Sequence, residues 1–237
     1  MNTRGNWWTR RRVVANLGRA TTLAVCAPSL PGCGDPSSGD SNGTDGGTDG
    51  STDGGTDGST GGEDGPVECL PTPDNIEGPF YRPNAPVNDQ VSPPMAPGDL
   101  LTVSGTVVDE DCTPIPFALL DIWQADAEGH YDNDPASPPP ADDEFFYRAQ
   151  VYADADGNFS FDSIVPGRYL NGAEYRPSHL HVKASAEDFE LLTTQLYFEG
   201  DPYNATDGFI KDELIMPVET DADGRRQCAF DFVLLRP

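Results

Sequence analysis

Basic residues are scarce in this chain. Its 237 residues include 14 lysines and arginines against 40 aspartates and glutamates, which gives a formal net charge of −26. Such a chain repels phosphate backbones, which argues against nucleic acid as a partner. Long apolar runs are missing too: none reaches the ~18 residues that a membrane-spanning helix needs, which excludes a polytopic membrane protein. No segment shows a long amphipathic helical period, so a helical fold is not expected.

Glycine and proline are abundant instead, with 25 and 23 residues. Both favour turns and loops over long helices. Between the turns lie short runs of apolar, β-branched and aromatic residues. We expect strands over 101–108, 117–123, 148–152, 159–164, 179–184, 191–198 and 229–235, with a hairpin turn at 154–157. This pattern predicts an all-β fold, an antiparallel β-sandwich with long loops.

The N-terminal 33 residues have features of an export signal. Arg10, Arg11 and Arg12 precede a mildly apolar stretch that ends in Leu-Pro-Gly-Cys at 30–33. This ending resembles a bacterial lipobox, so we expect a lipid anchor at Cys33 and an exported protein. The protein would be membrane-anchored, periplasmic or extracellular. A short amphipathic helix is the alternative reading of this segment.

Residues 34–68 are dominated by glycine, serine, threonine and aspartate, with no basic residue. Nothing here can fill a core, so the composition predicts a disordered linker whose charges repel one another. A calcium-binding repeat is the alternative, but the spacing fits neither an EF-hand loop nor a nonapeptide repeat. We therefore expect a signal or lipoprotein segment at 1–33, a linker at 34–68 and one folded domain at 69–237.

Three cysteines, Cys69, Cys112 and Cys228, fall in the expected domain. In an exported protein they predict one disulfide and one free thiol, and the sequence leaves the pairing open. No two of them are close in sequence, which argues against a cysteine-ligated zinc site.

Two of the three histidines, His179 and His181, are separated by one residue on an expected strand. Residues i and i+2 of a strand project from one face, so both imidazoles can reach one metal ion. Two ordinary strand histidines are the alternative. Phenolate oxygens are hard donors and would favour a highly charged ion such as ferric iron. The spacing leaves four tyrosines open as further ligands: Tyr131, Tyr147, Tyr169 and Tyr175.

Six motifs follow one another along the expected domain. They are NIEGPFY at 75–81, PIP at 114–116, DIWQADAEGHY at 121–131, IVPGRY at 164–169, RPSHLH at 176–181 and TQLYF at 194–198. In this order they resemble the intradiol ring-cleavage dioxygenases. The resemblance implies that family's β-sandwich and a catechol or other phenolic substrate. Dioxygen would open the ring between the two hydroxyl-bearing carbons to give a muconate-type diacid.

The resemblance also implies a site, residue by residue. It implies non-haem iron(III) held by four ligands: Tyr131, Tyr169, His179 and His181. Tyr131 corresponds to the ligand that also takes up a substrate proton, which makes it a catalytic residue as well. Arg176 and Gln195 correspond to the residues that stabilise charge developing on the reacting oxygens.

The chain departs from the family in several places. Residues 69–100 are rich in proline and too short for the helical dimerisation region of the catechol branch. Protocatechuate enzymes instead pair two homologous chains, and this chain carries no second copy of the domain. The interval 131–145 also differs from the family's known substrate pockets. The exact catechol and the oligomeric state therefore stay open.

Three other functions compete with this one. The turn pattern is also similar to that of transthyretin-like and carboxypeptidase regulatory-type modules, which bind or brace without a metal. The linker and the acidity would suit a surface adhesin or stalk. A degenerate dioxygenase would keep the iron site without turnover. An iron protein differs from the metal-free module and from the adhesin because its four ligands must converge on one point.

Overall fold

The computed structural model describes residues 69–135 and 140–237. The expected signal segment with Cys33, the expected linker at 34–68 and residues 136–139 lie outside the described residues. Within the described part of the chain, no helix is long and apolar enough to cross a membrane.

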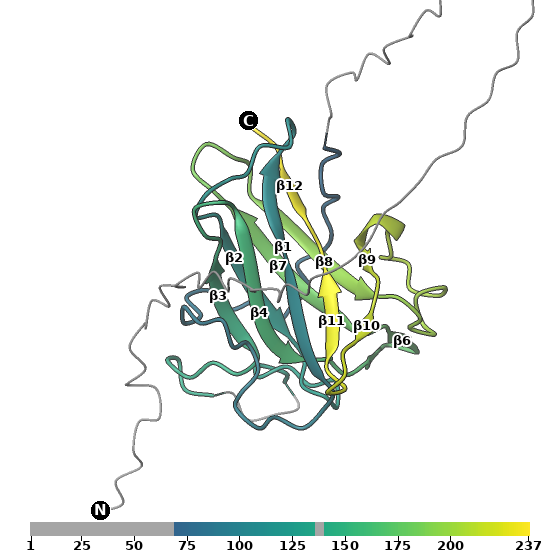
Figure 1. The fold of residues 1–237 in the computed structure, drawn as a ribbon. Coiled ribbons are helices and arrows are strands. Elements are labelled where there is room, and N and C mark those ends of the chain that lie inside the picture. The colour runs from purple at the N-terminus through teal and green to yellow at the C-terminus, as the bar shows by residue number, and fades with distance from the viewer. Residues whose placement is uncertain (1–68, 136–139) are drawn as a thin grey trace, which may run out of the picture. The chain divides into compact units, whose positions relative to one another are not determined.

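Two five-stranded sheets form the framework of the described part (Figure 1). The site-bearing sheet has the order β3 (Arg148–Tyr152), β2 (Leu119–Gln124), β7 (His179–Ser185), β8 (Leu192–Phe198) and β9 (Ile215–Met216). The second sheet contains β10 (Glu219–Thr220), β11 (Arg226–Ala229), β1 (Leu100–Asp109) and β12 (Phe232–Leu234), with β4 (Asn158–Ile164) paired to β1. A small hairpin joins β5 (Tyr169–Asn171) to β6 (Glu174–Arg176), and a 3-10 turn, η1, spans Asp212–Leu214.

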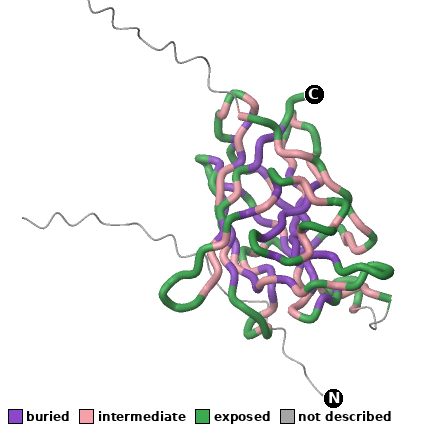
Figure 2. Tube along the Cα trace, turned by 90° about the vertical axis from the view of Figure 1, so that its right-hand side faces the viewer, coloured by how far each residue is buried: buried purple, intermediate pink, exposed green. Residues whose placement is uncertain are grey.

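The core lies between the two five-stranded sheets. Val103 of β1 and Phe161 of β4 come from one sheet, and Ile122 of β2 and Val182 of β7 come from the other. All four side chains are buried in one apolar cluster, whose removal from water stabilises the sandwich. Figure 2 shows the buried residues gathered in the interior, while exposed residues follow the loops. The expected all-β sandwich is confirmed.

The strand pairing is mixed rather than wholly antiparallel. β1 pairs in parallel with β11 and β12, and β8 pairs in parallel with β9. The single strand expected at 229–235 is also divided into the end of β11 and β12. The break lies at Phe230 and Asp231, where Asp231 Oδ1 accepts a hydrogen bond of 2.8 Å from the N–H of Thr106. At this point a side-chain hydrogen bond replaces the backbone ladder, so the pairing with β1 is interrupted between β11 and β12.

The N-terminal segment, residues 69–91, crosses the outer face of the site-bearing sheet. Its Asn75 N–H donates to the Thr193 carbonyl on β8, and its Asn88 N–H donates to the Gln150 carbonyl on β3. A disulfide from Cys69 to Cys112 fixes its start beside the turn that follows β1. Among the described cysteines, Cys228 remains as a free, buried thiol. The sheet face opposite the core is thereby covered by chain.

Candidate functional site

The two strand histidines lie on the outer face of the site-bearing sheet. They alternate along β7 with Leu180 and Val182, whose side chains belong to the core, so both imidazoles project to the other side. Both are buried, with 2% of His179 and 1% of His181 exposed. The β7 sequence therefore places two ring nitrogens side by side beneath the N-terminal segment.

The hydroxyl of Tyr131 meets both imidazoles. Tyr131 Oη lies 2.9 Å from Nε2 of His181 and 3.4 Å from Nε2 of His179. Nδ1 of His179 lies 2.7 Å from the carbonyl of Pro177 and donates to it, because a carbonyl oxygen only accepts. The lone pair of His179 Nε2 is then directed at Tyr131. Three donor atoms from a loop and a strand converge on one buried point, which we call the donor cluster.

Tyr169 lies at the edge of the donor cluster, at the start of β5. Its ring is 5.8 Å from that of Tyr131, at 83°, and 5.7 Å from that of His179. Tyr169 is half-buried, whereas Tyr131 is 2% exposed. All four residues expected as ligands are therefore neighbours. The other two open candidates are near but make no ring contact with the donor cluster among the described residues. Tyr147 lines a second hollow that Tyr131 also borders, and Tyr175 packs on Tyr203 and lines a hollow together with Tyr169.

Burial makes the donor cluster electrically neutral when no cation is bound. Desolvation, reinforced by the Arg176 cation, lowers the pKa of His179 to about 4. Desolvation, reinforced by the neighbouring His179, places the pKa of His181 well below its usual value. Desolvation and the neighbouring Tyr169 raise the pKa of the Tyr131 phenol well above 10. Two neutral imidazoles beside a phenol can offer lone pairs to a cation, and a bound cation would lower the raised pKa of the phenol so that it binds as phenolate.

Aromatic rings hold the donor cluster in place. Trp123 stacks on His181 with centroids 4.7 Å apart at 12°, and Phe80 stacks on Tyr131 at 4.3 Å and 13°. Among the described residues, no group hydrogen-bonds to Nδ1 of His181. The stacking on Trp123, its cross-strand neighbour, therefore fixes the ring plane of His181.

Arg176 and Gln195 lie next to the donor cluster and bond to each other. Arg176 Nη2 donates to Gln195 Oε1 at 2.8 Å and to the Tyr197 hydroxyl at 3.1 Å, while its Nε donates to Asp207 at 2.6 Å. Gln195 is the cross-strand neighbour of His181, and its Nε2 donates to the Ile76 carbonyl at 2.7 Å. Arg176 is thus a fixed, buried cation, and Gln195 is tied to the N-terminal segment that covers the site.

A hollow of about 540 Å³ opens beside the donor cluster. Phe80, Tyr169 and Arg176 form part of its wall, together with Gly129 and Leu170. A single aromatic ring fits this space with room for substituents. The sequence singled out Tyr169 and Arg176, but it did not assign Phe80 a role: only its place in the motif at 75–81 hinted at one.

Close backbone approaches at two glycines bring the loop that carries Tyr131 (the Tyr131 loop) against the loop that leads into Tyr169 (the Tyr169 loop). Gly129 has φ +90°, and a Cβ on it would lie 2.3 Å from the Arg168 carbonyl oxygen. A Cβ on Gly167 would lie 2.4 Å from the Gly129 nitrogen. The two loops approach this closely because neither glycine carries a side chain.

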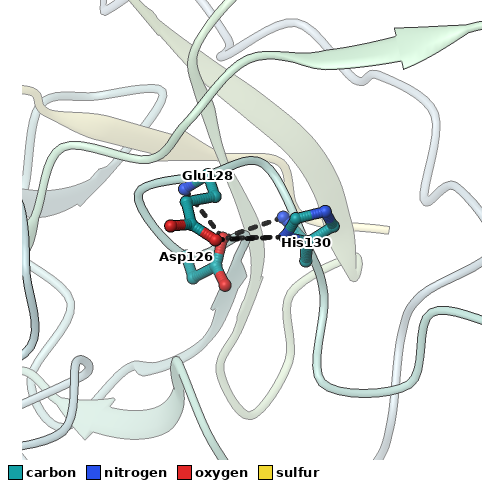
Figure 3. A group of neighbouring side chains, drawn as sticks. All are labelled: Asp126, Glu128 and His130. Atoms are coloured by element: carbon teal, nitrogen blue, oxygen red, sulfur yellow. Dashed lines mark hydrogen bonds and ion pairs between the residues drawn. The ribbon is translucent and has the colours of Figure 1, made fainter. Parts of the chain in front are cut away.

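Asp126, Glu128 and His130 gather in the turn just before Tyr131 (Figure 3). Asp126 Oδ1 accepts hydrogen bonds of 2.9 Å from the N–H groups of Glu128 and His130. Glu128 and His130 are exposed and Asp126 is half-buried. The carboxylate of Asp126 closes the turn that delivers Tyr131 to the donor cluster, and this role explains the grouping.

Comparison with known proteins finds relatives that are all named dioxygenases. A family model described as "Dioxygenase" matches residues 76–236. Chlorocatechol 1,2-dioxygenase of Rhodococcus opacus is 35% identical, with 66% of this chain and 69% of that protein covered. Catechol 1,2-dioxygenase 2 of Acinetobacter lwoffii is 34% identical, with 65% of this chain covered; the chain spans only 62% of the length of that relative.

Solved structures show the same fold. The dioxygenase domain of a dioxygenase–carbohydrate-binding protein fusion from Streptomyces sp. SirexAA-E is 40% identical, with a TM-score of 0.61, and the match covers 71% of this chain and all of that one. The 3-chlorocatechol 1,2-dioxygenase of Rhodococcus opacus 1CP is 28% identical, with a TM-score of 0.63 and coverage of 70% and 73%. Together with the family model, these matches show that the chain belongs to the intradiol ring-cleavage dioxygenases, a family of oxidoreductases.

Proposed function

We propose that this protein is a non-haem iron(III) dioxygenase that opens a catechol-type ring between its two hydroxylated carbons. The product would be a muconate-type diacid that carries both atoms of O2. One observation carries the proposal: the Tyr131 hydroxyl lies within 3.4 Å of the Nε2 atoms of His179 and His181 on a buried sheet face. A brace or an adhesin has no need for such a convergence.

The donor set suits ferric iron. Tyr131, Tyr169, His179 and His181 would hold the ion through two phenolate oxygens and two imidazole nitrogens. Phenolate oxygens favour a hard, highly charged cation over copper(I) or zinc. Metal–ligand bonds of about 2 Å place neighbouring donors roughly 3 Å apart, which agrees with the separations of Tyr131 from the two histidines. Bound iron would supply a Lewis acid that makes a catechol hydroxyl more acidic.

The protein's own groups would handle protons and charge. Tyr131 Oη is placed to accept a proton from a substrate hydroxyl that enters the adjacent hollow. Arg176 lines that hollow as a buried cation whose position is fixed by Asp207 and Gln195, so it would stabilise negative charge on the substrate oxygens. Gln195 would orient Arg176 and would keep one N–H available, since its Oε1 and one N–H are already bonded.

We also propose that the domain works outside the cytoplasm, held to a membrane through a lipid on Cys33. The sequence of residues 1–33 and the composition of the linker motivate this. The Cys69–Cys112 disulfide supports it, because disulfides persist in oxidising compartments. Fractionation of cells that express the full chain tests it: the protein should sediment with membranes, and Cys33→Ala should release it. A protein that stays in the cytosol in its mature form would refute the proposal.

Turnover with a defined isotope tests the proposed activity. The full-length protein, loaded with iron, would be given catechol, a chlorocatechol or protocatechuate under ¹⁸O2. We expect oxygen uptake with at least one substrate and a ring-opened diacid that carries two labelled oxygens. Absence of uptake with all three by a protein that binds iron would support a degenerate site. A ring opened beside, rather than between, the hydroxylated carbons would refute the intradiol assignment.

A further inference from the structure

Asp132, the residue after Tyr131, is the centre of a buried ion-pair network. Its Oδ1 accepts from Arg148 Nε at 2.7 Å and from Arg148 Nη2 at 2.5 Å, so two arginine N–H groups share one carboxylate oxygen. Its Oδ2 accepts from Arg82 Nη1 at 2.8 Å and from the Phe146 N–H at 3.2 Å. The side chains of Asp132 and Arg148 are 2% and 1% exposed. Four donors therefore saturate a carboxylate that water hardly reaches.

The network connects the Tyr131 loop to the sheet that carries the histidines. Arg148 on β3 is the cross-strand neighbour of Trp123 on β2, and Trp123 is the cross-strand neighbour of His181 on β7. Trp123 also stacks on His181. Asp132 is thus bonded to one end of a row of side chains whose other end is the His181 imidazole. Tyr131 is joined to this row through one peptide bond.

The same network holds the chain on the far side of the loop. Arg82, in the N-terminal segment, donates to Asp132 and also to the Glu144 carbonyl at 3.0 Å. The Phe146 N–H donates to Asp132 as well. Asp132 therefore ties three separate stretches of chain, those of residues 82, 131–132 and 144–148, to one point beside the donor cluster.

We propose that Asp132 is a positioning residue: its bonds to Arg148 and Arg82 hold the Tyr131 hydroxyl against the two imidazoles. This inference rests on the proposed function, in which Tyr131 is an iron ligand. Without the carboxylate, the buried Arg148 and the half-buried Arg82 lose their shared partner, and Arg148 already has an Nη1 with no hydrogen-bond partner among the described residues. The loop would then relax away from β3 and carry Tyr131 with it.

Asp132→Asn tests this, with Asp109→Asn as the matched control. Asp109 is also a buried carboxylate, 3% exposed, that accepts from an arginine, Arg236, and from a backbone N–H, that of Thr113. It is the last residue of β1, where its Oδ1 accepts from N–H groups of the following turn, and it contacts none of the four candidate ligands. Both variants lose an ionic hydrogen bond, so both are expected to unfold at a lower temperature. If Asp132 had a merely structural role, this lower unfolding temperature would be the only effect of Asp132→Asn.

Two measurements on the full-length protein separate positioning from general stability. The first is the tyrosinate-to-iron(III) absorption per bound iron, which should fall by about half in Asp132→Asn, because one of two phenolates no longer reaches the ion. Asp109→Asn should keep the wild-type value. The second is hydrogen exchange of the metal-free protein over residues 129–134, which should become faster in Asp132→Asn and stay unchanged in Asp109→Asn. Asp132→Glu, which restores the charge, should recover part of the absorption.

The outcomes distinguish this inference from the proposed function. If the wild type binds iron with the tyrosinate absorption and both aspartate variants match it, the positioning role is refuted while the proposed function stands. If the wild type itself shows no such absorption, the proposed function fails and the inference falls with it. Faster exchange in Asp132→Asn together with an unchanged absorption also refutes the inference, since loosening of the loop would then leave the position of the Tyr131 hydroxyl unchanged.

Discussion

Gly129 approaches Arg168 so closely that a Cβ on residue 129 would lie 2.3 Å from the Arg168 carbonyl oxygen. A backbone atom cannot move aside as a flexible side chain would, and φ at Gly129 is +90°, a region that other residues rarely adopt. Gly129→Ala should therefore separate the Tyr131 loop from the Tyr169 loop. We expect a loss of more than about 2 kcal/mol in the free energy of unfolding.

Iron content distinguishes this effect from a simple loss of stability. Gly129→Ala should bind substoichiometric iron even at a temperature at which it is fully folded. Gly172→Ala is the control, because φ there is also positive, at +68°, but a Cβ would meet nothing within 4 Å. If Gly129→Ala retains full iron and near wild-type stability, the close approach of the two loops is not required for the site.

Removal of different candidate ligands should have different effects on iron binding and on turnover. Tyr131→Phe removes one donor oxygen and the proposed proton acceptor, so iron should stay bound while turnover falls by about 10²-fold or more. His179→Ala or His181→Ala removes a buried nitrogen at the floor of the cluster and should lower iron content sharply. Metal analysis and steady-state oxygen uptake on the same samples measure both effects. Full iron content in both histidine variants would show that the ligand assignment is wrong.

The Cys69–Cys112 disulfide should stabilise the domain substantially. It closes a chain segment of 43 residues, for which loop-closure entropy predicts about 4 kcal/mol. It also fixes the start of the segment that carries Ile76 and Phe80 over the site. Cys69→Ser should lower the denaturant midpoint relative to the wild type, and a reductant should lower the wild-type midpoint equally. A midpoint that is unchanged by both treatments would contradict this.

Acid should weaken the turn that follows β1. Burial alone would raise the pKa of Asp109, but hydrogen bonds from the Thr113 N–H and from Arg236 outweigh it and hold the pKa below 3.8. A carboxylate with a lowered pKa contributes stability that is fully present above pH 3.8 and is lost as the pH falls through its folded-state pKa. Asp109→Asn should thus cost about 1 to 2 kcal/mol at pH 7 and less as the pH drops below 3.8.

Unfolding of the metal-free wild type and Asp109→Asn, followed from pH 7 down through the acid range, measures that difference. The two free-energy curves should converge at low pH. A constant gap across the whole range would mean that the carboxylate charge contributes nothing.

Local patterns in the sequence were enough to predict most strands. The alternation around Val103 and Phe161 marks one buried face, and this pattern survives folding because each residue's face is fixed by the pleat. The break at Phe230 and Asp231 was missed because its cause is distant in sequence: Asp231 accepts from the Thr106 N–H, and Gly105 lies against the Phe230 carbonyl, where a Cβ would come within 1.8 Å. The small hairpin of β5 and β6 was missed as well, since its three-residue strands are too short to show a period.

The candidate site was only partly visible in the sequence. The spacing of His179 and His181 predicts two donors on one face, but it cannot choose a tyrosine, because Tyr131 comes from a loop and Tyr169 from the start of the short strand β5. Only the resemblance selected them. The bond between Asp132 and Arg148 gave no signal at all: sixteen residues separate them, and only the register of β3 against β2 brings the arginine beneath the loop.

The visible spectrum of the full-length protein after iron loading tests the central claim most directly. If Tyr131 and Tyr169 bind ferric iron beside His179 and His181, the protein should bind one iron per chain and be red-brown, and a catechol should shift the absorption. A colourless protein that takes up no iron, with the fold intact, would contradict the account and leave only a β-sandwich.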